Sequence, residues 1–319
     1  MPTANSGTGP ADGAGEGPGL PVPGRKSTVG EVLLAYLDEQ SRELLADEAA
    51  VRRGDDDAVH SMRSTARRIR SALQAHHPVV RKAAARRLGE DLRWLGHFLG
   101  DPRDAEVLRE RVLTELRALP RFHDAQAALL PVERELDAAW AAGRRRLLTA
   151  LDSRTYRGML EALADFRNDP PFIADAGRRA REAGAAVVDD AARRMERSRL
   201  RAKKRRGTPE YDDALHEVRK DAKRLRYSAE SVAAAGARHT AALGRAGKRI
   251  QQALGEQHDA AGTRDFLIRL AAAPGLPEDL AEAYREAGEA QAKKARDAER
   301  QYRRVYRKAR RKTHGFTLR

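Results

Sequence analysis

The sequence predicts an all-α protein in which one helical unit occurs twice. Ala, Leu, Glu and Arg dominate after the first segment, and apolar residues recur at spacings of three and four rather than two, as on amphipathic helices. Gly and Pro interrupt the chain at intervals that suit helices of roughly 15–30 residues in an antiparallel bundle. One basic stretch occurs twice, at residues 59–70 and 215–226, and a repeat at a fixed offset is typical of a duplicated unit.

The first predicted helix follows a segment that has too few large apolar residues to form a hydrophobic core. Residues 1–26 consist mainly of Gly, Pro, Ala, Thr and Ser, so we expect a disordered tail. Thr28 and Glu31 have the spacing of a capping box, which predicts that a helix opens near Thr28. Gly54 and the acidic run 55–57 are expected to end this helix and to cap the next one.

Prolines and glycines predict the remaining helix ends of the first half. Pro78 should end the helix with the first basic stretch. Further stops are expected at residues 100–102, at Pro120 and at Pro131. The run Asn-Asp-Pro-Pro at 168–171 is the strongest interruption in the middle of the chain, so we place the boundary between the halves there.

The second half repeats this plan. A long helix should run to about Arg206, and a break at 207–209 should precede the helix with the second basic stretch. Later breaks are expected near Gly236, at Gly255 and from Pro274 to Pro277, and a basic final helix should run to Lys312. The predicted segments are therefore a disordered tail at 1–26, a first helical-bundle repeat at 27–170, a second at 171–312 and a C-terminal tail at 313–319.

Composition indicates an acidic partner. The chain has 62 Lys and Arg against 47 Asp and Glu, a formal net charge of +15, which attracts polyanions over a long range. The absence of Cys excludes disulfides, thiolate nucleophiles and Cys-ligated zinc. No apolar run approaches the roughly 20 residues that cross a bilayer, and residues 1–26 have no apolar core of a secretory signal. We therefore expect a cytoplasmic protein without a membrane partner.

Each basic stretch has a cationic face and an apolar face when it is drawn as a helix of about 100° per residue. The cationic faces hold His60, Arg63, Arg67 and Arg70 in the first copy, and His216, Arg219, Lys220, Lys223 and Arg226 in the second. The helix after each copy extends the charge, with Lys82, Arg86 and Arg93 in the first half and Lys248 in the second. Arg68 and Arg224 lie to one side and are expected at the rim.

These cationic faces suggest an anion-binding site. A charged stripe is often only a solvated face, but solvated faces mix both signs, and residues 60–70 contain no acid. Arg contacts phosphate oxygens bidentately and Lys contacts them as a point charge, so cations one turn apart suit successive phosphates of an extended chain. His60 and His216 are expected either to contact the anion, gaining charge below about pH 6.5, or to orient their helices by hydrogen bonding.

The two copies resemble the motif of a known family. Each copy has the form His-x-x-Arg-x-x-x-[Arg/Lys]-Arg-[Leu/Ile]-Arg and is followed by Leu-Gly-x-x-[Arg/His]-Asp, at 99–104 and at 254–259. This pattern over roughly residues 27–312 is similar to the CHAD domain, the α-helical domain named for its histidines. The resemblance implies two tandem four-helix bundles with approximate two-fold symmetry, whose basic helices line a groove or pore that binds inorganic polyphosphate. It also implies a stand-alone, non-catalytic form, because no Glu-x-Glu strands of a triphosphate-cleaving barrel are present.

Other signals keep two alternatives open. The basic segments 193–206 and 293–312 favour nonspecific nucleic-acid binding, although few aromatic residues are present to stack on bases. A metal-dependent phosphohydrolase is suggested more weakly by His258-Asp259 and by His76-His77, which lack the further ligands of a closed metal site. We therefore expect no metal and no cofactor, and we interpret Asp104 and Asp259 as helix N-caps.

Overall fold

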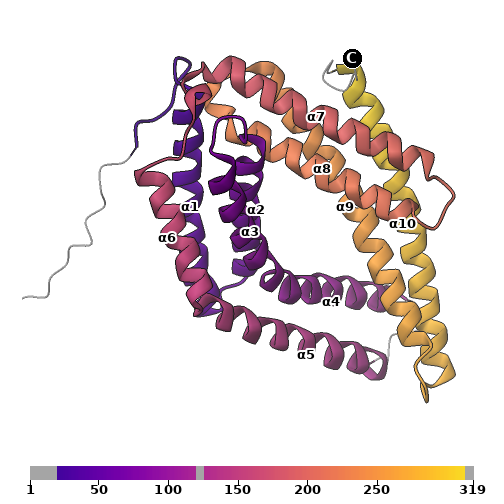
Figure 1. The fold of residues 1–319 in the computed structure, drawn as a ribbon. Coiled ribbons are helices and arrows are strands. Elements are labelled where there is room, and N and C mark those ends of the chain that lie inside the picture. The colour runs from indigo at the N-terminus through magenta and orange to yellow at the C-terminus, as the bar shows by residue number, and fades with distance from the viewer. Residues whose placement is uncertain (1–19, 120–125, 313–319) are drawn as a thin grey trace, which may run out of the picture.

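The computed structural model describes residues 20–119 and 126–312, and within these ranges the chain is helical without a named strand, which confirms the all-α prediction. Its α-helices are α1 (Val29–Arg53), α2 (Ala58–Ala75), α3 (Lys82–Phe98), α4 (Gly100–Ala118), α5 (Gln126–Leu151), α6 (Arg154–Asn168), α7 (Ala180–Lys204), α8 (Tyr211–Ser231), α9 (Arg238–Ala271) and α10 (Glu278–Lys312). Figure 1 shows α1, α2, α3 and α6 on one side, α9 and α10 on the other, α7 and α8 across the top and α4 and α5 across the bottom. None of these helices is both long enough and apolar enough to cross a bilayer.

Local sequence explains how α1 begins and ends. The Thr28 side chain accepts a hydrogen bond from the Glu31 backbone N–H at 3.2 Å, and the Glu31 carboxylate accepts one from the Thr28 N–H at 2.9 Å. This confirms the predicted capping box. At the other end Gly54 has a φ of +83°, a left-handed conformation that a residue without Cβ adopts at little cost.

The predicted capping of α2 by the acidic run is wrong. Asp57 stands at the N-cap position, but its φ of 56° is left-handed and its side chain makes no capping hydrogen bond. Its carboxylate instead lies 3.4 Å from a guanidinium nitrogen of Arg103 on α4. An ion pair with α4 has therefore replaced the local cap.

Two predicted helix stops are also wrong. Pro131 lies within the second turn of α5, where it removes one backbone hydrogen bond without ending the helix. Gly255 lies inside the continuous helix α9, whereas in the first half α3 and α4 meet around Gly100. Pro102 follows Gly100, but no proline follows Gly255, which explains why only the first half is interrupted. Pro120 lies outside the described residues.

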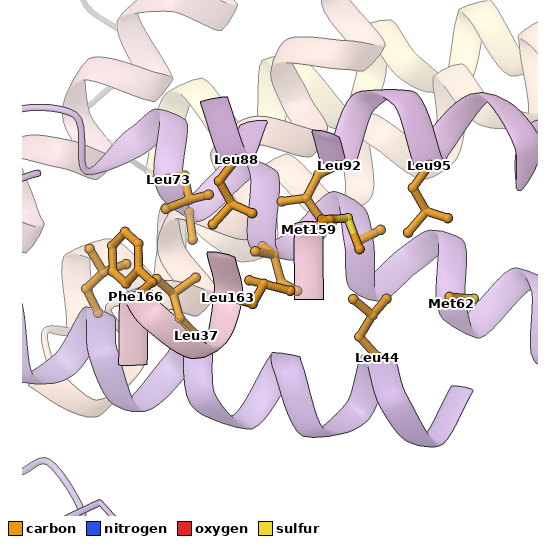
Figure 2. Close-up of a cluster of buried hydrophobic side chains, with 14 of the residues drawn as sticks. Leu37, Leu44, Met62, Leu73, Leu88, Leu92, Leu95, Met159, Leu163 and Phe166 are labelled. Atoms are coloured by element: carbon orange, nitrogen blue, oxygen red, sulfur yellow. The ribbon is translucent and has the colours of Figure 1, made fainter. Parts of the chain in front are cut away.

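Buried apolar side chains form three main cores. One lies among α1, α2, α3 and α6, and Figure 2 shows several of its leucines together with Met62, Met159 and Phe166. A second lies among α7, α8, the beginning of α9 and the end of α10. The third joins α4 and α5 to the end of α9 and the beginning of α10, so α9 and α10 each extend through two cores. This third core adds to the pair of bundles that the family resemblance implies.

Close packing of α9 on α8 fixes the position of the second basic stretch. A Cβ atom at Gly244 would lie 2.6 Å from the Cβ of Ala229, and one at Gly247 would lie 3.0 Å from the carbonyl oxygen of Ala222. Such distances leave no room for a methyl group unless the two helices separate.

We therefore expect Gly244→Ala to lower the free energy of unfolding by about 1–3 kcal/mol, because the overpacking outweighs the gain in helix propensity. Gly262→Ala is the matched control, since it lies in the same helix and its Cβ would meet nothing within 4 Å. It should be neutral or stabilising by up to about 1 kcal/mol. Urea unfolding of both variants tests this, and equal stability of the two would contradict it.

Candidate functional site

Helices α2 and α8 pack directly against each other, and their cationic faces meet. The charges of Arg63 and Arg67 on α2 act on Lys223 of α8, and Arg63 also acts on Arg219. Figure 1 shows the two helices adjoining near the centre of the fold. The two basic stretches, far apart in the sequence, thus form one region of positive charge.

A cavity of about 910 Å³, here called the basic cavity, lies beside this contact, with walls from α2, α3, α7 and α8. The predicted site residues in its walls are Arg63, Arg67, Arg70, Lys82, Arg86, Arg93 and Lys220. All of them are cationic, and their helices belong to both halves of the chain. The cavity is therefore a concave surface where anionic groups would be attracted from several sides.

Two further arginines line the basic cavity. Arg224, expected at the rim, and Arg194 of α7 both contact Asp221, at 3.1 Å and 2.8 Å. Arg224 also donates a hydrogen bond to the side chain of Gln74 on α2, 3.0 Å away. The sequence signal for Arg194 was its place in the basic segment 193–206, but only the packing of α7 beside α8 places it in this cavity.

His216, Arg219 and Lys223 lie on the side of α8 that faces α9, and they do not line the basic cavity. The ring centroids of His216 and His258 of α9 are 4.7 Å apart. Arg219 is largely buried, with 17% of its side chain exposed, and its Nε has no hydrogen-bond partner in the described structure. This group, the α8–α9 cluster, continues the positive region beyond the cavity.

Arg63 and Arg219 of the motif helices are held by two aspartates. These aspartates are the last residues of the two Leu-Gly-x-x-[Arg/His]-Asp elements, at 99–104 and at 254–259. Arg63 donates a hydrogen bond to Asp104 at 2.7 Å, and Arg219 lies 3.6 Å from Asp259. The N-cap interpretation is wrong for both aspartates, because Asp104 lies inside α4 and Asp259 inside α9. Sequence reasoning noticed the repeated Leu-Gly-x-x-[Arg/His]-Asp but did not assign this role.

Glycines of the same repeated element lie beside these ion pairs. A Cβ at Gly100 would lie 3.9 Å from both a guanidinium nitrogen of Arg63 and a carboxylate oxygen of Asp104. A Cβ at Gly255 would lie 3.7 Å from two guanidinium nitrogens of Arg219. At these distances a methyl group would make ordinary van der Waals contact, so the ion pairs alone do not require glycine at either position.

Basic side chains of the region without a carboxylate partner among the described residues include Arg67, Arg70, Lys82, Arg93 and Lys223. Burial lowers the pKa of Arg67 and of Arg70, and neighbouring arginines lower both further. Burial, reinforced by the charges of Arg67 and Arg219, lowers the pKa of Lys223 to about 6. The region therefore favours any group that brings negative charge.

The histidines of the motif are neutral at pH 7. His60 is exposed, but desolvation by its neighbours and the charge of Arg103 lower its pKa, and burial together with the charge of His258 lowers the pKa of His216 to about 4. The expectation that His216 becomes charged below about pH 6.5 is therefore wrong. Its Nδ1 is buried and has no hydrogen-bond partner in the described structure, so a role in orienting α8 through that atom is not seen.

Three more predicted site residues, in addition to His216, Arg219 and Lys223, lie outside the walls of the basic cavity. His60 is exposed at the start of α2, and Lys248 is exposed on α9. Arg226 donates a hydrogen bond to Glu230 at 2.7 Å and stands over the ring of Tyr227. Arg68, expected at the rim, lies 3.4 Å from Glu43 and 3.8 Å from Glu230.

Comparison with known proteins agrees with this architecture. The family model of the CHAD domain matches residues 35–268.

This chain belongs to the CHAD domain family.

Two uncharacterized proteins of Mycobacterium tuberculosis, MT2285 of strain CDC 1551 / Oshkosh and Rv2226 of strain ATCC 25618 / H37Rv, are each 36% identical to this CHAD chain over 245 residues. The matched region is 74% of this chain but 45% of each relative, so the chain spans less than half the length of these curated relatives.

Two solved structures share the fold. PptA from Streptomyces chartreusis matches with a TM-score of 0.73 and 19% identity, over 88% of this chain and 100% of that one. The CHAD domain of the plant Ricinus communis matches with a TM-score of 0.68 and 24% identity, over 92% and 97%. At these identities the likeness concerns the fold alone.

The histidines of the two sequence pairs weighed as metal ligands, His76-His77 and His258-Asp259, have other contacts in this CHAD protein. His76 is completely buried with its Nδ1 3.0 Å from the carbonyl oxygen of Ala72, and His258 contacts His216. Among the residues that the structure describes, no three His, Asp or Glu side chains are grouped in a way that could hold a metal ion.

Lys223 provides a test of the uncompensated charge. Its pKa lies near 6 in the folded protein and near the ordinary value of 10.5 in the unfolded chain, so the unfolded chain binds the proton between these values. Stability therefore falls as pH decreases from about 10.5 to 6.

We expect Lys223→Met to stabilise the anion-free protein at pH 6.5 by on the order of 1 kcal/mol or more, and the gain to shrink toward pH 9.5. Lys248→Met, at an exposed lysine, is the control and should have little effect at either pH. Urea midpoints at the two pH values measure both. A gain from Lys223→Met that is independent of pH would contradict the assignment.

Proposed function

We propose that this CHAD protein binds inorganic polyphosphate through the basic cavity and the adjoining α8–α9 cluster, and that it catalyses no reaction on the polymer. The observation that supports this most directly is the meeting of two cationic helix faces, where Arg67, Arg70 and Lys223 have no carboxylate partner. Partly buried charges of one sign are costly unless an ion of the other sign neutralises them. A polyanion supplies that charge without requiring any further protein group.

The arrangement of the cations suits an extended polymer rather than a single small anion. Arg63, Arg67 and Arg70 follow one another along α2 at intervals of about one helical turn, roughly 5.4 Å. Arg86 and Arg93 continue the series on α3. Planar guanidinium groups contact phosphate oxygens in pairs, so successive phosphates can each meet a different arginine. Membership of the CHAD family supports phosphate as the repeating unit.

We further propose that the two halves, 27–170 and 171–312, are copies of one helical bundle related by approximate two-fold symmetry. The paired contacts support this, because Arg63 with Asp104 and Arg219 with Asp259 repeat the same ion pair on matching elements. Departures from symmetry support unequal roles for the halves. Ser64, for example, stands where the second copy has the cationic Lys220.

The cellular role follows from the ligand. A polyphosphate-binding protein without a catalytic site would act in the cytoplasm, at polyphosphate granules, as a storage or recruitment factor. Because the chain spans less than half of its curated relatives, any activity of the longer proteins is a separate question.

Competition between polyanions tests the ligand. Long-chain polyphosphate, single-stranded RNA and duplex DNA are compared at equal phosphate concentration and at one stated salt concentration, since affinity for phosphates depends steeply on salt. We expect labelled polyphosphate to remain bound in the presence of RNA or DNA. Displacement by either nucleic acid would favour nonspecific nucleic-acid binding instead.

Charge removal on α2 tests the site. In the variant Arg63→Gln, Arg67→Gln, Arg70→Gln, each lost guanidinium is worth on the order of 1–3 kcal/mol, so long-chain affinity should fall by more than about 100-fold. The loss for tripolyphosphate should be smaller, because only a long chain gains by contacting α2 and α8 at once. The matching triple variant at Arg219, Lys223 and Arg226 should behave alike.

The control for these variants removes the same charge elsewhere. Arg145, Arg154 and Arg157 are exposed on α5 and α6, and their replacement by Gln should leave polyphosphate affinity within a few-fold of the parent. Binding is measured by titration calorimetry and helix content by circular dichroism. Equal losses for the control and for the α2 variant would mean that only net charge matters, which would refute a defined site.

A further inference from the structure

A second cavity, of about 490 Å³, lies between the ends of α7 and α10 and the beginning of α8. We call it the tyrosine cavity, because Tyr211, Tyr302 and Tyr306 contribute to its walls. It shares no lining residue with the basic cavity. The fold thus brings together the basic segments 193–206 and 293–312, which the polyphosphate proposal leaves without a role apart from Arg194.

Hydrogen bonds and stacking hold the rings of this cavity in place. The Tyr306 hydroxyl donates to Glu196 at 2.5 Å, and the Tyr211 hydroxyl donates to Glu299 at 2.5 Å. The guanidinium of Arg199 lies 4.6 Å from the centre of the Tyr306 ring and is itself bound by Glu196. Ala202 and Leu215 complete an apolar wall beside these planar groups. The recess is therefore preformed.

The cations around the tyrosine cavity fall into two groups. Arg199 and Arg303 are neutralised by Glu196 and Glu299 and serve to fix the rings. The exposed cations Lys203, Arg206, Arg307 and Arg310 form no ion pair with a carboxylate within the described residues. An apolar recess lined by tyrosines is thus bordered by four cations that are available to an anion.

The two cavities differ in the ligand chemistry that they favour. The walls of the basic cavity contain no Tyr, Phe or Trp, and an inorganic phosphate chain has no apolar part that could use such rings. A nucleobase does, because bases stack on aromatic rings and on guanidinium planes while their phosphates bind nearby cations. A volume of about 490 Å³ also falls within the range of small-molecule sites.

We propose that the tyrosine cavity binds a nucleoside phosphate, with the base in the recess and the phosphate at Arg307 and Arg310. This nucleoside phosphate can be a free nucleotide or one residue of a single-stranded nucleic acid. This site is separate from the polyphosphate site and rests on different residues, so either proposal can fail without the other.

The first test uses a short oligoadenylate RNA as the probe, with fluorescence anisotropy as the readout. The variant Arg307→Gln, Arg310→Gln should lose about tenfold or more in affinity, and the slope of log affinity against log salt should fall by about one per cation removed. Its affinity for long-chain polyphosphate should change less than about threefold. The variant Arg67→Gln, Arg70→Gln should show the reverse pattern, losing polyphosphate and retaining the oligonucleotide.

The second test separates a base-binding site from a mere basic patch. Tyr211→Leu should lower oligoadenylate affinity about tenfold, whereas Tyr211→Phe, which keeps the ring, should stay close to the parent. Unchanged polyphosphate binding of both variants shows that the fold is intact. If Tyr211→Leu binds the oligonucleotide like the parent, or if the parent binds neither oligoadenylate nor AMP, the proposal is overturned.

A parallel titration with AMP shows whether the bound nucleoside phosphate is a free nucleotide or part of a single-stranded nucleic acid. AMP binding that depends on Tyr211 and Arg307 supports the proposal with a free nucleotide as ligand. Binding of the oligonucleotide alone, with the same dependence, supports it with a single strand as ligand. Displacement of oligoadenylate by inorganic polyphosphate from the Arg67→Gln, Arg70→Gln variant would show that the tyrosine cavity binds anions by charge alone. That result would overturn the proposal.

Discussion

Repulsion between like charges at the contact of α2 and α8 is the constraint on which the rest of the site depends. Arg63 and Arg67 on one helix and Arg219 and Lys223 on the other act on each other through partly buried surroundings, where charges are screened less than in water. Burial, reinforced by the charges of Arg67 and Arg219, lowers the pKa of Lys223, so a further proton is unfavourable there. The free energy that keeps the two helices together must come from elsewhere in the molecule.

That free energy comes from the apolar faces on the far sides of the same helices. Met62, Ile69 and Leu73 of α2 are fully buried in the core with α1, α3 and α6, while Val218 and Leu225 of α8 are buried in the core with α7, α9 and α10. A buried leucine-sized side chain contributes about 1.5–3 kcal/mol. Because burial of these apolar faces fixes the positions of α2 and α8, the cations cannot move apart. Asp104 and Asp259, at the edge of the contact, neutralise only part of the positive charge.

The sequence predicted the parts of this arrangement that depend on one helix at a time. Amphipathic spacing correctly placed the cationic and apolar faces of both motif helices, because that pattern is written in local order. It could not place Arg194, whose position depends on how α7 packs beside α8, nor the role of Asp259, which is set by the register of α9. The predicted helix stop at Gly255 failed for the same reason, since burial of α9 against other helices outweighs the weak local preference of one glycine.

On the two proposals, the two cavities would let one fold separate ligands that are all anionic. Net positive charge alone attracts any polyanion, so discrimination must come from what lies beside the cations. In the basic cavity the arginines stand among small side chains, other cations and four carboxylates, and a chain of bare phosphates would suit the arginines that have no carboxylate partner. In the tyrosine cavity the free cations border rings that Glu196 and Glu299 hold rigid, and a bare phosphate would leave those rings unused. On the two proposals, the presence of aromatic side chains at one basic surface and their absence from the walls of the other would be the physical means of distinguishing a phosphate polymer from a nucleoside phosphate.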